Sequence, residues 1–243
     1  MDLALLKSKG LIRQLYAPAA SDVTFPYGLG TQGLHEVLEE AYGDRAAVTG
    51  FVLTATKATR SQALFWISQS STRRDMGRLS EAALQEMTRG NISCLSLATR
   101  PARDALWAAE EAVISGAVSH VIAEVDMADF TATRRLALAS ERHGVPVTLM
   151  LPYRCEGATA AATRWRISPR PSTPNPYDAR ALGRPRWSAS LERCRIAPSA
   201  SGRTFEIEWN DETLSLCVVS GMVAGQITPR TARAGNFYPR KAG

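Results

Sequence analysis

The chain is 243 residues long, with 45% hydrophobic and 21% charged residues, so it can bury one substantial core and has the composition of a soluble globular protein. No apolar stretch approaches the roughly 20 residues that a membrane-spanning helix needs, and four scattered cysteines without a C-x-x-C pair argue against a zinc site. The formal net charge is +6, and arginine far outnumbers lysine, a field that favours phosphate-rich or acidic partners.

The first third of the chain opens with a predicted short helix over residues 3–15, in which leucines alternate with basic residues. This segment lacks the uninterrupted apolar core and the cleavage site of a signal peptide, so we expect a cytoplasmic protein. A strand is predicted over 33–37, and apolar residues at helical spacing predict a helix over 44–59. The continuous apolar run at 63–67 predicts a strand that is covered on both faces.

From residue 79 onward, helices and strands alternate at regular intervals. Pro101 stands at a helix start, where its missing N–H costs nothing, and Gly116 and Gly144 each follow a helical stretch. This rhythm predicts a mainly parallel sheet with helices on its faces. The predicted helices cover 79–87, 101–116 and 131–143, and the predicted strands cover 92–97, 118–125 and 146–151.

After residue 160 the rhythm changes to short strands without helices between them. Trp187, Ala189 and Leu191 alternate with polar residues, which is typical of half-buried antiparallel strands. We therefore expect an N-terminal helix and linker over 1–24, one α/β domain over 25–220 and a flexible basic tail over 221–243. The predicted short strands cover 164–168, 186–195, 204–209 and 213–219, with a Pro-rich loop over 169–185.

This order of elements resembles the RecA core, and local sequence agrees. Ser115-Gly116-Ala117-Val118, leading to Glu124, resembles the segment that carries the Walker B carboxylate of RecA. Residues 33–37 stand where RecA has the strand entering its phosphate loop, and 193–198 resemble the RecA strand that ends in Lys-x-Lys-Ile-Ala-Ala-Pro. The resemblance implies an α/β fold with a RecA-like core: a mainly parallel sheet flanked by helices, with a C-terminal antiparallel extension.

A second resemblance, over about residues 25–210, is to the ImuA family, the RecA-like and often SulA-labelled accessory proteins of damage-inducible mutagenesis. It is carried by Leu34-His35-Glu36 and by the segments at 105–112, 131–136, 163–166 and 183–187, in this order and spacing. It implies an SOS-regulated role in translesion synthesis. The implied partners are an ImuB-like Y-family protein, an error-prone replicative-type polymerase α subunit and, as a further candidate, RecA filaments near the nucleoid.

The expected phosphate loop is degenerate. A phosphate loop needs glycines, whose backbone N–H groups wrap the phosphates, and a lysine that neutralises them. Residues 38–47 contain one glycine, Gly43, together with three carboxylates, and no Gly-Lys pair occurs in the chain. Arg45 could supply a charge but not the backbone cradle. We expect Gly43, Arg45 and Glu124 to mark a degenerate nucleotide site, with no ATPase activity and no cofactor.

No other catalytic constellation stands out. The G-x-S-x-G motif of a nucleophile elbow is missing, and the stretch Ser68-Gln69-Ser70 offers no acid to orient a water molecule. His35 and His120 fall in predicted strands, and no chemistry can be named for His35, whereas His143 in a last helix turn is a favourable charge against the helix dipole. Cys94 and Cys217 fall in apolar, strand-like runs and are expected to be small core residues. The sequence therefore favours a binding protein.

Two groups of basic residues are candidate binding surfaces, and a solvated basic face is the alternative for both. The first group is Arg193 and Arg195 with Arg184 and Arg186, and Arg193 and Arg195 match the RecA lysine pair that reaches the nucleotide of the neighbouring subunit. The resemblance thus implies docking on the nucleotide-bearing end of a RecA filament, or on another partner. The second group is a set of candidates for weak or indirect DNA contact, in which Trp165 is alternatively a core residue. It comprises Arg134, Arg135, Arg164, Trp165, Arg166 and Arg170.

Two functions of other classes stay open at this point. One is a RecA-type ATPase with a divergent nucleotide site, which nucleotide binding through Glu124 or Arg45 would indicate. The other is a SulA-like cell-division inhibitor, which binding to the tubulin-like division protein would indicate.

Overall fold

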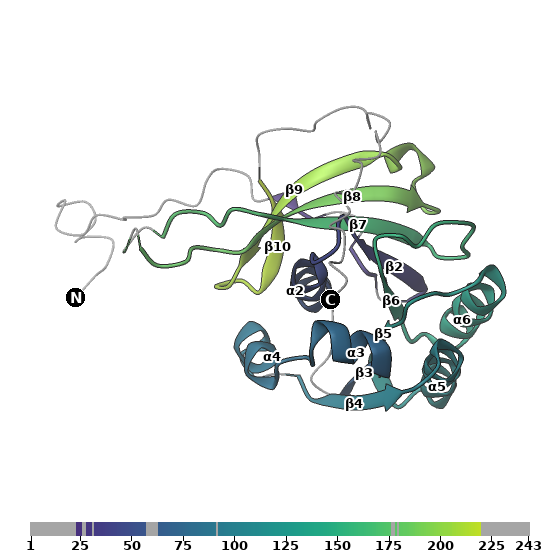
Figure 1. Cartoon of the computed structure of the whole chain (residues 1–243). Helices are drawn as coiled ribbons and strands as arrows, with labels where there is room; N and C mark the ends of the chain where they lie inside the picture. The colour runs from purple at the N-terminus through teal and green to yellow at the C-terminus, as the bar shows by residue number, and fades with distance from the viewer. Residues whose placement is uncertain are drawn as a thin grey trace, which may run out of the picture.

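The computed structural model describes residues 23–25, 28–30, 32–56, 63–90, 92–175, 178 and 180–219. Its strands form one ten-stranded sheet in the order β1-β10-β9-β8-β7-β2-β6-β5-β3-β4 (Figure 1). The helix predicted over 3–15 and the tail predicted over 221–243 lie outside the described residues. The α/β architecture expected from the sequence is confirmed: a large, mainly parallel sheet flanked by helices, with antiparallel C-terminal strands.

Six neighbouring strands at one end of the sheet run parallel to one another, and helices connect most of them. The strands are β2 (Leu34–Glu39), β3 (Ala63–Gln69), β4 (Cys94–Thr99), β5 (Val118–Glu124), β6 (Val147–Leu151) and β7 (Thr163–Arg170). The helices are α2 (Arg45–Ala55), α3 (Ser70–Met76), α4 (Glu81–Thr88), α5 (Ala102–Ser115) and α6 (Phe130–His143). The sequence did not predict α3, because it buries none of its residues and so has no apolar stripe.

Each face of the parallel sheet buries its own hydrophobic cluster. Phe51 of α2 and Leu84 of α4 belong to one cluster, whereas Ala109 of α5 and Leu136 of α6 belong to the other. Figure 1 shows α2, α3 and α4 on one side of the sheet, and α5 and α6 on the other. The strands between them are therefore covered on both faces, which explains their continuous apolar runs.

The predicted helix ends agree with the structure. Gly116 and Gly144 end α5 and α6 in the left-handed conformation, with φ of 64° and 72°. At the start of α6, the Asp129 carboxylate accepts a hydrogen bond from the Ala132 N–H at 2.7 Å. These caps satisfy backbone groups that have no partner inside the helix, so they fix where each helix begins and ends.

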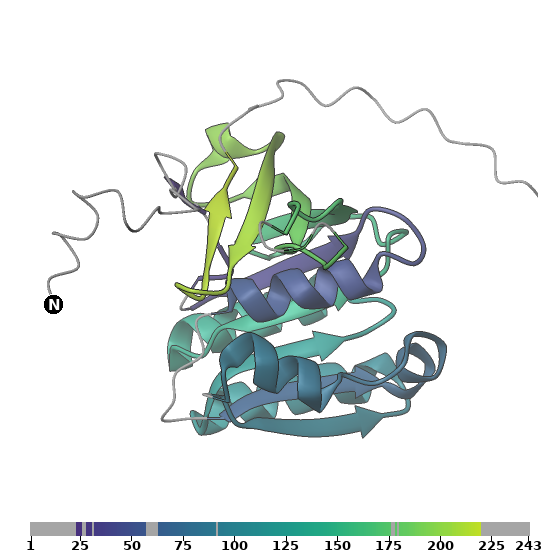
Figure 2. The same ribbon diagram turned by 90° about the vertical axis from the view of Figure 1, so that its left-hand side faces the viewer.

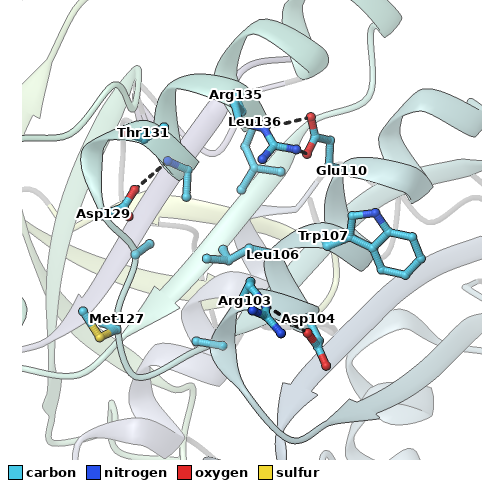
Figure 3. A pocket seen from close by; sticks show the side chains of 13 residues that line it. Arg103, Asp104, Leu106, Trp107, Glu110, Met127, Asp129, Thr131, Arg135 and Leu136 are labelled. Carbon is cyan, nitrogen blue, oxygen red and sulfur yellow. Dashed lines mark hydrogen bonds and ion pairs between the residues drawn. The ribbon is translucent and has the colours of Figure 1, made fainter.

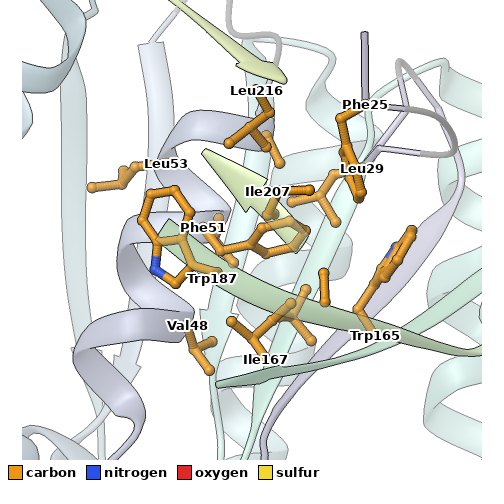
Figure 4. Close-up of a cluster of buried hydrophobic side chains, with 14 of the residues drawn as sticks. Phe25, Leu29, Val48, Phe51, Leu53, Trp165, Ile167, Trp187, Ile207 and Leu216 are labelled. Carbon is orange, nitrogen blue, oxygen red and sulfur yellow. The ribbon is translucent and has the colours of Figure 1, made fainter. Parts of the chain in front are cut away.

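The antiparallel end of the sheet packs one face on α2 and leaves the other polar (Figures 1 and 2). Trp187, Ala189 and Leu191 are buried, as their alternation predicted. Together with Phe51 and Trp165 they belong to the larger cluster (Figure 4). This part contains β1 (Val23–Thr24), β8 (Arg186–Cys194), the short helix η1 (Pro198–Ala200), β9 (Arg203–Asn210) and β10 (Ser215–Val218).

Strand β7 joins the two parts of the sheet, which the sequence did not predict. It pairs parallel with β2 and antiparallel with β8, although its sequence was grouped with the antiparallel strands. Strand alternation shows which faces are buried, but the direction of a neighbour depends on the path of the whole chain.

Strand β4 forms an edge of the sheet, and this corrects one expectation. Cys94 on β4 and Cys217 on β10 are only partly buried, and Cys94 packs against the periphery of the larger cluster. Leu95 and Leu97 of β4 expose 55% and 36% of their surface, because no further strand in the described part of the chain covers that edge. None of the described helices has the length and apolar character to span a membrane.

Candidate functional site

The carboxyl ends of β2, β3, β5 and β6 meet at one edge of the sheet, which is where ligands commonly bind in α/β proteins. Strand β2 ends at Glu39, and α2 begins at Arg45. The connection between them holds Gly43, whose φ of 99° requires a residue without a side chain in a tight turn. This is the position at which the RecA resemblance places the phosphate loop.

A buried ion pair occupies this position. Arg45 Nε lies 2.7 Å from Glu39 Oε1, and the two side chains expose only 8% and 1% of their surface. Burial raises the pKa of the Glu39 carboxyl, and the Arg45 charge opposes that rise. Arg45 therefore neutralises a carboxylate of its own chain at the point where a nucleotide phosphate would need a cation.

A second arginine, Arg166 of β7, also contacts the end of β2. Arg166 forms an ion pair with Glu192, and its Nη1 donates to the backbone oxygens of Glu39 and Tyr153 at 2.9 and 3.1 Å. The Tyr153 ring meets the Tyr42 ring edge to face, with their centroids 6.4 Å apart. These contacts tie the end of β2 to the segment after β6, so Arg166 is a structural cross-link.

Glu124, at the position that resembles Walker B, also has an internal partner. Its carboxylate accepts a hydrogen bond of 2.6 Å from the Ser68 hydroxyl, and only 7% of the residue is exposed. Next to it, the Gln69 amide donates to the Asp126 carboxylate at 3.0 Å. The described residues contain no group of three or more His, Cys, Asp or Glu side chains placed to hold a metal ion. The two hydrogen bonds thus join the carboxyl ends of β3 and β5.

The structure does not place the three β7 candidates for DNA contact on an open surface. Arg164 Nε lies 2.6 Å from Glu36 Oε2, and the other oxygen of this carboxylate, Oε1, accepts a hydrogen bond from the Thr159 hydroxyl; the Glu36 side chain is 1% exposed. The Trp165 ring is fully buried, 5.1 Å from the Phe25 ring, which confirms the core interpretation. With Arg166 also paired, all three side chains have contacts within the chain, and a DNA contact through these residues stays a prediction.

The remaining candidates for DNA contact lie apart. Arg134 is exposed on α6, whereas Arg135 forms an ion pair with Glu110 of α5. Arg170 lies at the end of β7 and forms an ion pair with Glu206. The structure therefore places these arginines on two separate elements and gives two of them acidic partners.

The structure also splits the four arginines proposed to meet a partner. Arg186 begins β8 and Arg193 lies near its end, a separation of roughly 24 Å along an extended strand. Arg184 and Arg186 form ion pairs with acids of the β9–β10 region, among them Glu208. Arg193 and Arg195 instead donate to backbone carbonyls of the segment that precedes β7. They form two sites rather than one.

Two predicted strand histidines form a buried polar row that sequence reasoning missed. His35 lies 2.8 Å from the Thr163 hydroxyl, and His120 lies 2.8 Å from the Thr148 hydroxyl. Strands β5, β6, β2 and β7 are neighbours, so the four side chains cross the sheet. Burial lowers the pKa of His35 to about 4 and that of His120 to about 3. Both are therefore neutral at physiological pH, in structural roles.

An open groove lies between the first turns of α5 and α6 (Figure 3). Its volume is about 510 Å³. Leu106 and Leu136 line it together with several smaller side chains. Trp107 and Met127 also line it, and they expose 59% and 62% of their surface. Sequence reasoning missed this feature, although Trp107 lies outside the buried stripe of α5, and an exposed tryptophan on a helix is the signal that could have found it.

Comparison with known proteins finds similarity to ImuA over part of the chain. The chain is 40% identical over 111 residues to Protein ImuA of two strains of Caulobacter vibrioides, NA1000 / CB15N and ATCC 19089 / CIP 103742 / CB 15. This match covers 42% of the chain and 45% of each relative, so the chain spans less than half the length of the curated relatives it matches.

No protein-family model matches the chain. Among solved structures, SulA from Pseudomonas aeruginosa aligns with a TM-score of 0.38 and 15% identity, over 49% of the chain and 97% of SulA. We draw no conclusion about fold or function from a likeness this weak. The resemblance to ImuA expected from the sequence is confirmed by the match to the Caulobacter vibrioides protein: over these 111 residues the chain is similar to ImuA.

Proposed function

We propose that this protein is a non-catalytic accessory factor of DNA-damage-induced mutagenesis. In this proposal it recruits or regulates an ImuB-like Y-family protein and an error-prone polymerase of the replicative type during translesion synthesis, and it meets RecA filaments. The proposal is supported by the 40% identity to ImuA over 111 residues. It is supported further by the carboxyl edge of the sheet, where the charged side chains at the end of β2 already have partners within the chain.

The observation that carries the non-catalytic part is the ion pair between Glu39 and Arg45. Nucleotide hydrolysis needs a backbone cradle and a cation that stabilises the charge on the transferred phosphoryl group. Here the nearest cation already neutralises a buried carboxylate, and separating a buried pair costs about 3–5 kcal/mol. A phosphate would have to break this pair and would then lie beside the Glu39 charge.

The part of the proposal that concerns RecA rests on Arg193 and Arg195. Their side chains donate to the carbonyl oxygens of Thr159 and Ala160 at 2.9 and 3.3 Å, and the Arg195 side chain is 50% exposed. Arg195 also lies 3.8 Å from the Glu141 carboxylate, and each guanidinium carries five N–H groups, so donors remain beyond these contacts. Such a pair suits a phosphate of a nucleotide presented by another subunit.

The experiment is co-purification of the full chain with an ImuB-like partner and its polymerase, together with binding to RecA filaments on single-stranded DNA. We expect a stable complex, and we expect R193E/R195E to weaken RecA binding at least tenfold. The matched control is R170E, which changes an exposed arginine of the same sheet that is paired with Glu206. Equal RecA binding by R193E/R195E and the unchanged chain would contradict the RecA part.

The same preparation separates the two other functions. ATP hydrolysis by the chain that disappears in E124Q would indicate a divergent ATPase. Binding to the tubulin-like division protein, with no complex with the ImuB-like partner, would indicate a division inhibitor. Either result would overturn the proposed function.

A further inference from the structure

The groove between α5 and α6 differs from the rest of the carboxyl edge in its lining. Alanines and leucines line much of it, and Trp107 and Met127 are large apolar side chains that stand mostly in solvent (Figure 3). Exposed large apolar side chains beside a cavity are a signature of protein interaction sites, since they do not contribute to the core. The groove volume of about 510 Å³ gives room for several side chains of a partner.

The walls of the groove are set by interactions within the chain. At one end, Arg135 of α6 forms an ion pair with Glu110 of α5, which links the two helices. Arg103 Nε lies 3.5 Å from Asp104 Oδ1 within α5. The ion pair between α5 and α6 holds the two walls together at one end, and a groove formed before binding lowers the entropic cost of association.

The charge around the groove is opposite in sign to that of the whole protein. Three acidic residues, Asp104, Glu110 and Asp129, and two arginines, Arg103 and Arg135, line the groove, so its lining carries one more negative than positive charge, whereas the full chain has a net charge of +6. Asp104 and Asp129 are exposed, and Asp126, next to Met127, is exposed as well. An acidic rim repels nucleic acid phosphates and attracts basic side chains. The exposed indole face of Trp107 can also accept a cation.

We propose that this groove binds a basic amphipathic helix of a partner polypeptide. The apolar face of that helix lies against Trp107, Met127 and Leu106, and its lysines or arginines meet the acidic rim. Two helices that flank an apolar groove suit this mode of recognition, in which anchors recur at positions i, i+3, i+4 and i+7. The inference deepens the proposed accessory role by naming the class of segment that the partner presents, and only the identity of that partner rests on the proposed function.

The test uses the full chain and two synthetic helical peptides of equal length. Both carry leucines at i, i+3, i+4 and i+7, and the other positions are lysine in one peptide and glutamate in the other. Binding is measured by titration calorimetry and by tryptophan fluorescence. We expect the lysine peptide to bind at least tenfold more tightly than the glutamate peptide, with a blue shift that Trp107→Phe removes.

Variants of the groove locate the binding. Met127→Lys and Trp107→Ala should each weaken the binding of the lysine peptide at least tenfold, and Asp104→Lys should reduce the preference for this peptide over the glutamate peptide. Ile196→Ala is the matched control, because Ile196 is 80% exposed and does not line the groove. All these positions are largely exposed, and unchanged thermal unfolding would establish that each variant folds.

Two results would overturn the inference: equal binding of both peptides, or binding of the lysine peptide that Met127→Lys leaves unchanged. Failure here is distinguishable from failure of the proposed function. If Met127→Lys leaves the complex with the ImuB-like partner intact, the accessory role is kept and the groove is excluded as its site. Peptide binding in the groove without any such complex leaves the groove standing and removes the accessory role.

Discussion

Two parts of the carboxyl edge of the sheet differ in how their charged residues are placed. At the end of β2, Glu39, Arg45 and Arg166 are buried and matched to partners within the chain. Beyond the end of β5, the groove at α5 and α6 leaves Trp107 and Met127 in solvent, beside an acidic rim. In the first part, ion pairs within the chain occupy the charged side chains, whereas the second part is an open groove with apolar side chains in solvent.

This difference shows that the density of arginines along a sequence is a poor guide to a binding surface. Ten arginines lie between residues 154 and 203 against three acids, and the stretch therefore looked like a field for phosphates. In the structure Arg164, Arg166 and Arg170 all pair with acids that are distant in sequence or on a neighbouring strand. The surface most suited to a partner lies instead where the chain is locally acidic.

The largest effect on stability is expected when the ion pair at the end of β2 is removed. Arg45→Ala leaves Glu39 buried without its partner, and we expect a loss of about 3–5 kcal/mol in the free energy of unfolding. The double variant E39L/R45L should recover most of this loss, because it removes both charges and keeps apolar volume. Urea unfolding followed by circular dichroism measures both. A loss below about 1 kcal/mol in the single variant would mean that the pair does not close the edge.

A fall in pH should lower the stability of the sheet but leave binding in the groove unchanged. His35 and His120 have folded pKa values of about 4 and 3, below the unfolded value of 6.5, so the unfolded chain binds more protons in between. Their contribution to stability is complete above pH 6.5 and is lost as the pH falls towards the folded pKa values. Between pH 6.5 and 5.5 the free energy of unfolding should fall by about 2 kcal/mol.

In the variant His120→Gln this fall should be about half as large, since one of the two groups no longer titrates. The residues that line the groove include no histidine. Binding of the lysine peptide should therefore stay nearly constant over the same pH interval. A parallel fall in binding affinity, with the protein still folded, would show that the groove depends on the histidine row.

Two arginines on the same face of β7 test how far burial decides the effect. The Arg164 side chain is 12% exposed and paired with Glu36, whereas the Arg170 side chain is 45% exposed and paired with Glu206. Arg164→Ala should cost about 2 kcal/mol of stability, because it leaves Glu36 buried with less compensation. Arg170→Ala should cost less than about 0.5 kcal/mol, since water screens the pair. Chemical denaturation of the two variants side by side decides this, and equal costs would refute it.

The smallest effect on stability is expected in the groove. Trp107→Ala removes a side chain that is mostly exposed, so the free energy of unfolding should change by less than about 0.5 kcal/mol. Thermal unfolding of this variant provides the measurement. A larger loss would show that Trp107 packs as part of the core, and the contrast between the two parts of the edge would disappear.

The sequence by itself determined the class of fold and most of its elements. Continuous apolar runs marked β3, β5 and β6, and the glycines after α5 and α6 marked the helix ends. These signals are local, because hydrophobic period and capping depend on residues a few positions apart. The degenerate character of the loop after β2 was also visible in its residues.

Only the tertiary structure decided which charged residues are internal and which surface is open. Glu36 pairs with Arg164 across 128 positions of sequence, and Arg135 meets Glu110 from a different helix. The groove arises where two helices meet, and the direction of β7 depends on its neighbours β2 and β8. The physical reason is the same for all of these features. They are contacts between segments far apart in the chain, and no pattern within a single segment records its distant neighbours.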